Sequence, residues 1–76
     1  MSEQTPESVW ITRGMGLRLR AAREAKGFSQ SQLAQLTGSS LTQIEHYERG
    51  EHAMAMERLF DLARLLEIPA ADLFDA

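Results

Sequence analysis

The 76-residue chain contains no cysteine, and it has only two histidines, His46 and His52. Without thiols it has no disulfide framework, no thiolate metal site and no cysteine nucleophile. The two imidazoles are six positions apart, which matches neither helical metal ligands at i, i+4 nor a zinc finger. We therefore expect no bound metal, and the absence of cysteine is consistent with a reducing, cytoplasmic location.

Long apolar runs are also missing. No stretch approaches the roughly 20 residues that a membrane-spanning helix needs. The first residues are polar and include Glu3 and Glu7, unlike a secretory signal peptide. We expect no membrane association and a single small domain, whose core contributes about 3–5 kcal/mol of net stability.

Catalytic motifs are missing as well. Serines are present, but no motif suggests a serine–histidine–acid arrangement, and a domain of this size lacks a deep pocket. Gly14-Met15-Gly16 is similar to the start of a phosphate loop, but Leu19 stands where the third glycine belongs and no strand precedes it. We expect no enzyme, no cofactor and no small-molecule ligand.

The formal net charge of −3 argues against a nucleic-acid partner at first sight. Glu3 and Glu7 account for two of the 11 acidic residues, so nine remain from Arg13 onward against eight basic residues. The domain itself is therefore close to neutral. Because phosphate contacts are local, the placement of charge matters more than the sum.

The segment 28–50 predicts two short helices joined by a tight turn, over residues 30–36 and 41–48. Ser29 and Ser40 are good N-caps, because a hydroxyl accepts from the free N–H groups of the first turn. Gly38 suits the left-handed position at which a chain leaves a helix. Neither helix is long enough to be stable alone, so each must pack against the rest of the domain.

The second of these helices has two distinct faces. At about 100° per residue, Ile44, Tyr47 and Glu48 share the inward side. The opposite side is almost wholly polar and consists of Thr42, Glu45, His46 and Arg49. A polar helix face of this kind, held out by a partner helix, fits the DNA major groove.

This segment resembles the helix-turn-helix of the phage-repressor/Cro-type (XRE-like) family of bacterial regulators, which also serves as a standard example of DNA recognition. The resemblance runs without a gap from about residue 14 to 75. The matching residues are Lys26-Gly27-Phe28-Ser29-Gln30, Leu33-Ala34, Gly38, Ile44, Glu48-Arg49-Gly50, Arg58-Leu59-Phe60, Leu62-Ala63, Ile68-Pro69 and Asp72-Leu73-Phe74. It implies an all-α fold, a compact lambda-repressor-like bundle of five short helices, with a flexible arm over residues 1–12 and the domain over 13–76.

The resemblance also implies how DNA is contacted. The residues expected at base edges are Ser40, Leu41, Thr42, Gln43, Glu45 and His46. Those expected at the DNA backbone are Ser29, Gln30, Ser39, Arg49 and His52. An ion pair between Arg23 and Glu48 is implied as a structural tie between the first helix and the reading helix. The sequence departs from the family at Glu51, where a basic residue is common, and at Ala55, where a capping serine is usual.

Further helices are expected over residues 13–26, 56–67 and 70–74. In the fourth, Met56, Leu59, Phe60, Ala63 and Leu66 form the predicted inward stripe, with Leu62 at its border. The apolar triplet 9–11 has two open interpretations, as a staple onto the core or as a contact with a second subunit.

The function implied is sequence-specific binding of double-stranded DNA by a transcriptional regulator. We expect a homodimeric repressor that reads an inverted repeat with its third helix in the major groove. Two alternatives remain open: a helical protein-interaction module without DNA binding, motivated by the acidic balance, and the antitoxin of a toxin–antitoxin pair.

Overall fold

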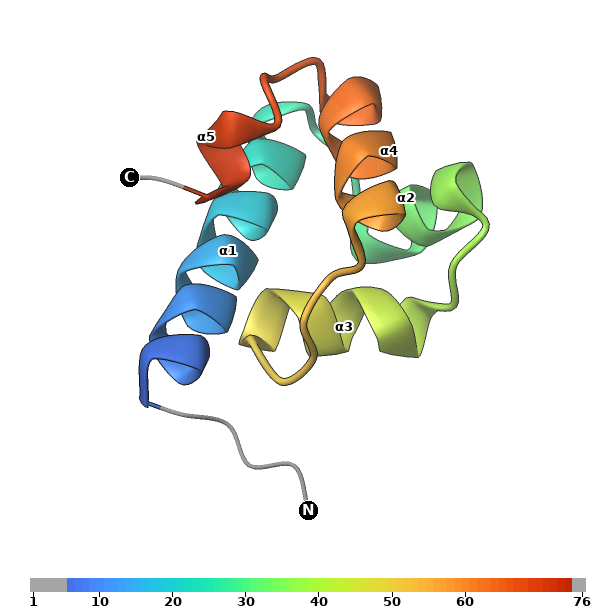
Figure 1. Cartoon of the computed structure of the whole chain (residues 1–76). Coiled ribbons are helices and arrows are strands. Elements are labelled where there is room, and N and C mark those ends of the chain that lie inside the picture. The colour runs from blue at the N-terminus through green and yellow to red at the C-terminus, as the bar shows by residue number, and fades with distance from the viewer. Residues whose placement is uncertain (1–5, 75–76) are drawn as a thin grey trace.

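A computed structural model of the chain describes the backbone of residues 6–74 and the side chains of residues 12–74. Within this range the fold is all-α, with no strand, as predicted. Figure 1 shows α3 crossing below α1 and α4. The five helices are α1 Pro6–Ala25, α2 Gln30–Thr37, α3 Leu41–Arg49, α4 Met56–Leu66 and α5 Ala71–Phe74.

The predicted ends of α2 and α3 are confirmed to within one residue. The Ser29 hydroxyl accepts from the Gln32 N–H at 3.0 Å, and the Gln32 side chain accepts from the Ser29 N–H at 2.8 Å, which completes a capping box. The Ser40 hydroxyl caps α3 by accepting from the Gln43 N–H at 3.0 Å. Gly38 closes α2 at φ 69°, in the left-handed region that glycine tolerates best.

The predicted start of the first helix is wrong. α1 begins at Pro6 rather than near residue 13, because proline is favoured at a first helical position and Gly14 and Gly16 do not interrupt the helix that follows. Helix therefore covers about half of the segment predicted as a flexible arm. The side chains of residues 1–11 lie outside the described part of the chain, so the domain boundary and the role of the 9–11 triplet stay predictions.

A single apolar core lies where the helices meet. Its fully buried side chains are Leu19, Leu33, Ile44, Leu59, Leu62, Leu66 and Leu73. The stripe predicted for α4 is wrong at two positions, since Met56 and Phe60 are 56% and 49% exposed while Leu62 is fully buried. Apolar residues cover most of this helix, so periodicity alone left its rotation undetermined.

The crossing of α1 and α3 depends on a glycine. A Cβ at Gly16 would overlap the carbonyl oxygens of Tyr47 and Glu48, the second at 2.6 Å. A Cβ at Gly50 would lie 2.7 Å from the Cα of Arg13. The last turn of α3 therefore packs directly on the backbone of α1.

The far end of the bundle is held by an ion pair between Lys26 and Glu67. Glu67 ends α4 in the left-handed region at φ 58°. The hydrogen bond from Lys26 lowers the pKa of Glu67. A carboxylate whose pKa is lowered in the folded state stabilises the fold at pH values above its ordinary pKa. That contribution is lost as the pH falls through the lowered pKa.

The N-terminus of α4 has no side-chain cap. Ala55 occupies the cap position at φ −65° and ψ 151°, a backbone conformation that suits serine. We expect Ala55→Ser to raise the free energy of unfolding by about 1 kcal/mol, because its hydroxyl would satisfy a free N–H. Urea denaturation measures this change. The matched control, Ala53→Ser in the preceding loop, should leave the midpoint unchanged, and an equal gain from both would contradict the capping explanation.

Candidate nucleic-acid interface

The exposed face of α3 is the predicted one. Ile44, Tyr47 and Glu48 are buried, as expected for the inward side. Side chains on the other side reach solvent to different degrees. Leu41, Thr42 and Arg49 are exposed, whereas Gln43, Glu45 and His46 are half-buried. Together these six residues form a mixed polar and apolar strip along one side of α3.

The predicted ion pair between Arg23 and Glu48 is present and buried. Arg23 donates from Nε to Glu48 Oε2 at 2.6 Å and from Nη2 to Oε1 at 3.1 Å. A third hydrogen bond runs from Arg23 Nη1 to the Phe28 carbonyl at 2.8 Å. The hydrogen bond to Glu48 raises the pKa of Arg23 against the opposing effect of burial. α1 thereby fixes the rotation of α3 about its own axis.

Gln30 joins the same network. Its Nε2 donates to Glu48 Oε1 at 3.0 Å, so three N–H groups converge on one carboxylate. This bond joins the start of α2 to the end of α3. The amide nitrogen carries a second hydrogen, so the DNA backbone contact predicted for Gln30 stays a prediction that this geometry allows.

The serine hydroxyls near the turn already have partners. Ser29 and Ser40 cap their helices, and the Ser39 hydroxyl lies 3.1 Å from the Thr37 hydroxyl. Contacts to phosphate at these serines would therefore come mainly from the free N–H groups of the helix termini. The DNA backbone contacts predicted for Ser29 and Ser39, and the base contact predicted for Ser40, stay predictions.

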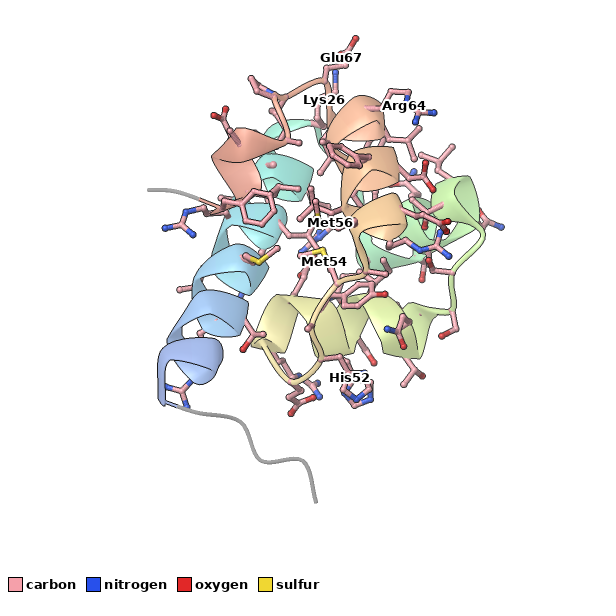
Figure 2. All side chains as sticks on the ribbon, viewed as in Figure 1. Lys26, His52, Met54, Met56, Arg64 and Glu67 are labelled. Carbon is pink, nitrogen blue, oxygen red and sulfur yellow. The ribbon has the colours of Figure 1, made fainter. Side chains whose placement is uncertain are left out.

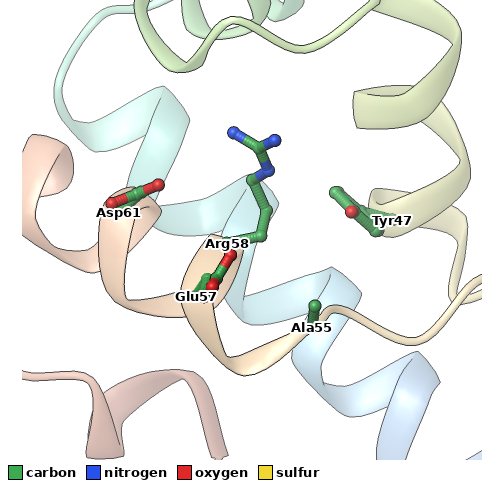
Figure 3. A pocket seen from close by; sticks show the side chains of 5 residues that line it. All are labelled: Tyr47, Ala55, Glu57, Arg58 and Asp61. Atoms are coloured by element: carbon green, nitrogen blue, oxygen red, sulfur yellow. The ribbon is translucent and has the colours of Figure 1, made fainter.

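Arg58 of α4 has a role that sequence reasoning missed. Its Nη1 donates to the Thr37 carbonyl at 2.5 Å. Thr37 is the last residue of α2, and a cation at the C-terminal end of a helix is stabilising. Figure 3 shows its side chain projecting from α4 beside a small cleft lined also by Tyr47, Ala55, Glu57 and Asp61. The helix-turn-helix is therefore held at its turn by α4 and at the end of α3 by α1.

A second group that the sequence did not reveal lies past the end of α3. The His46 Nδ1 and the Glu51 Oε1 are 2.6 Å apart, and the rings of His46 and His52 stack with centroids 4.3 Å apart. Figure 2 shows His52 below α3, at the end of the molecule opposite Lys26 and Glu67. The predicted contacts His46 and His52 are thus adjacent, and an unpredicted carboxylate accompanies them.

A family model described as Helix-turn-helix matches residues 19–73. The chain belongs to the phage-repressor/Cro-type helix-turn-helix family. This family consists of DNA-binding transcription regulators and is not an enzyme family. The resemblance stated from the sequence is confirmed, and so is the fold class.

Relatives of this helix-turn-helix chain carry regulator names. An uncharacterized transcriptional regulator in the ATPase CF(0) region of Rhodospirillum rubrum is 40% identical over 55 residues, which cover 72% of this chain and 51% of that protein. A putative HTH-type transcriptional regulatory protein of Thermococcus kodakarensis is 37% identical over 79% of this chain and 19% of its own length. The chain thus spans about half or less of the length of these relatives.

Two solved structures share the arrangement over most of their own length. The restriction-modification controller protein C.AhdI from Aeromonas hydrophila is 34% identical, with a TM-score of 0.78, over 92% of this chain and all of that one. The clp gene regulator ClgR from Corynebacterium glutamicum is 27% identical with a TM-score of 0.78, over 83% of this chain and 82% of that one.

Two further features bear on the kind of site. Among the described residues, no group of three or more histidine, cysteine or acidic side chains is placed to hold a metal ion. None of the helices over residues 6–74 is both long and apolar enough to cross a membrane.

Proposed function

We propose that this helix-turn-helix domain represses transcription as a homodimer that binds an inverted repeat in double-stranded DNA. The observation that carries the proposal is the solvent-facing strip of α3, held in place by the buried carboxylate of Glu48. A rigid helix with an exposed polar side is what major-groove reading requires. A domain bound to a promoter excludes other proteins from it. Because the proposed partner is genomic DNA, the proposed location is the bacterial cytoplasm.

The strip supplies chemistry for base edges. The Leu41 side chain and the Thr42 methyl would meet thymine methyls, and the Gln43 amide would pair with an adenine edge. Glu45 would accept from cytosine N4 and His46 would reach a neighbouring base. The backbone of the duplex would be met by Arg49, His52, Gln30, Ser39, Ser40 and the α2 terminus at Ser29.

The dimer rests on a separate observation. Met56 and Phe60 are exposed one turn apart on α4, and Phe74 on α5 is 42% exposed. Large apolar side chains in solvent often mark an interface. In a twofold dimer that reads an inverted repeat, the two α3 helices would lie about 34 Å apart, one turn of DNA. Sedimentation equilibrium tests this arrangement, and Phe60→Glu should shift the protein toward monomer.

An operator is first obtained by selecting the genomic fragments that the wild-type protein binds. We expect the double variant Thr42→Ala, Gln43→Ala to lose its preference for that operator while its melting temperature stays unchanged. Both side chains reach solvent, so truncation removes base contacts without opening the core. Each lost base contact costs about 1–3 kcal/mol of discrimination. Binding to operator and to scrambled duplex, measured by fluorescence anisotropy, gives the ratio of affinities.

A control and a salt series make this test decisive. Gln35→Ala, on the exposed side of α2, should keep full preference. Affinity for DNA should also fall steeply with salt, because each phosphate contact releases a counterion. A double variant whose melting temperature falls but whose operator preference is retained would mean that the faces are reversed. No binding to any genomic fragment at low salt would instead favour a protein-interaction module or an antitoxin acting on its toxin.

A further inference from the structure

The C-terminal cap of α3 folds two side chains back onto its DNA-facing strip. Gly50 is left-handed at φ 72°, and the Glu51 N–H donates to the His46 carbonyl at 2.9 Å. This reversal brings the Glu51 carboxylate to His46 Nδ1 at 2.6 Å and lays the His52 ring on the His46 ring, with an interplanar angle of 19°. The strip thus ends in two imidazoles and a carboxylate in mutual contact.

The carboxylate fixes the state of the first imidazole. A carboxylate accepts, so His46 donates its Nδ1 hydrogen to Glu51 and directs Nε2 away from it. In neutral His46, Nε2 is then an acceptor, so it forms no hydrogen bond with a phosphate oxygen, which is also an acceptor. A second proton converts Nε2 into a donor, which suits phosphate or the acceptor edge of guanine.

Charge favours the same conclusion. With both rings neutral, Glu51 leaves this cluster with a charge of −1 beside the DNA-facing strip, which repels phosphate. One added proton makes the cluster neutral. A second is disfavoured, because two cationic rings would stack with centroids 4.3 Å apart. Three other charged side chains belong to this region. Arg49 lies 4.0 Å from the same Glu51 oxygen, Glu45 precedes His46 on α3, and Arg13 of α1 packs on Gly50.

We propose that Glu51 is a positioning residue that makes His46 a proton-dependent DNA contact, so that the domain takes up one proton when it binds the duplex. The inference rests on the proposed function, because it assigns a property to the same strip. Imidazole is the side chain whose charge commonly changes between about pH 5 and 8, so the experiment covers that range. The His52 ring covers one face of His46 and restricts its rotation.

The test is operator affinity measured by anisotropy from pH 6 to pH 8 at constant ionic strength. One linked proton changes the dissociation constant by at most about tenfold per pH unit. We expect wild-type affinity to rise about three- to tenfold on acidification over this range. The double variant His46→Gln, His52→Gln removes every histidine of the chain and should show no such rise.

Two single variants separate charge from position. Glu51→Gln should bind at pH 8 more tightly than wild type and gain less on acidification, because the repelling charge is gone. Glu67→Gln makes the same charge change at the opposite end of the molecule and should keep the wild-type pH dependence. Melting temperatures confirm that all variants fold.

The outcomes distinguish the two proposals. Equal pH dependence in the wild type and the histidine-free variant overturns the role of the cluster while leaving DNA binding intact. A Glu51→Gln curve that superimposes on the wild-type curve overturns the positioning role of Glu51. Absence of DNA binding at every pH overturns the proposed function, and this inference with it.

Discussion

Gly16→Ala is expected to destabilise the domain strongly and to lower its melting temperature. A Cβ there would lie 2.6 Å from the Glu48 carbonyl oxygen and closer still to that of Tyr47. Both obstacles are backbone atoms in a helix, so relief requires α1 and α3 to move apart. Overpacking of this kind costs about 1–3 kcal/mol, which is a large share of the roughly 3–5 kcal/mol that a domain this small has. Circular dichroism melting measures the loss.

Gly14→Ala is the matched control. The same methyl group two residues earlier would meet only the guanidinium of Arg18, the movable end of a flexible side chain. Alanine also has the better helix propensity by about 1 kcal/mol. We expect this variant to melt at or above the wild-type temperature. Equal destabilisation by both variants would show that the helix crossing is not the cause.

The second large effect is expected from Glu48→Ala. This change leaves the Arg23 guanidinium, whose side chain is only 10% exposed, without its carboxylate partner. Breaking a buried pair from one side costs about 3–5 kcal/mol. Gln30 also loses its acceptor, so α2 loosens together with α1. Chemical denaturation should show a lower midpoint, and operator binding should weaken because the rotation of α3 is no longer fixed.

Two comparisons isolate the buried charge. Arg64 and Asp61 form an exposed pair at 3.4 Å on α4, and Asp61→Ala should cost at most about 0.5 kcal/mol. Replacing both buried partners, as Arg23→Met with Glu48→Met, should recover a large part of the loss, because no charge is then stranded. A double variant as unstable as Glu48→Ala would assign the effect to packing rather than to charge.

Local chemistry made much of the helix-turn-helix formed by α2 and α3 predictable. Capping hydroxyls, a left-handed glycine and the 3.6-residue period fix α2 and α3 within a few residues of chain, so the sequence carries the signal directly. The pairing of Arg23 with Glu48 spans 25 residues and was reached only through the family resemblance. The structure confirms it.

Long-range contacts account for what the sequence did not reveal. From the sequence, Gly16 only weakens a helix. The structure shows that the backbone of α3 packs against it. Met56 and Phe60 are as apolar as the buried leucines of α4, so only the packing of neighbouring helices decides which side is covered. Glu51 meets His46 through the reversal at Gly50, and no periodicity describes a chain that has just left its helix.

The reading helix is held at both ends: Arg58 anchors the turn before it, and the backbone of α1 lies against its last turn. Segments tied in this way open only when the whole domain unfolds, so amide hydrogens at the end of α3 should exchange with solvent as slowly as any in the protein. The helix then has little freedom to adjust to a poor fit. Adaptation falls to the duplex, and operators whose base steps bend easily should be favoured even at positions that no side chain touches.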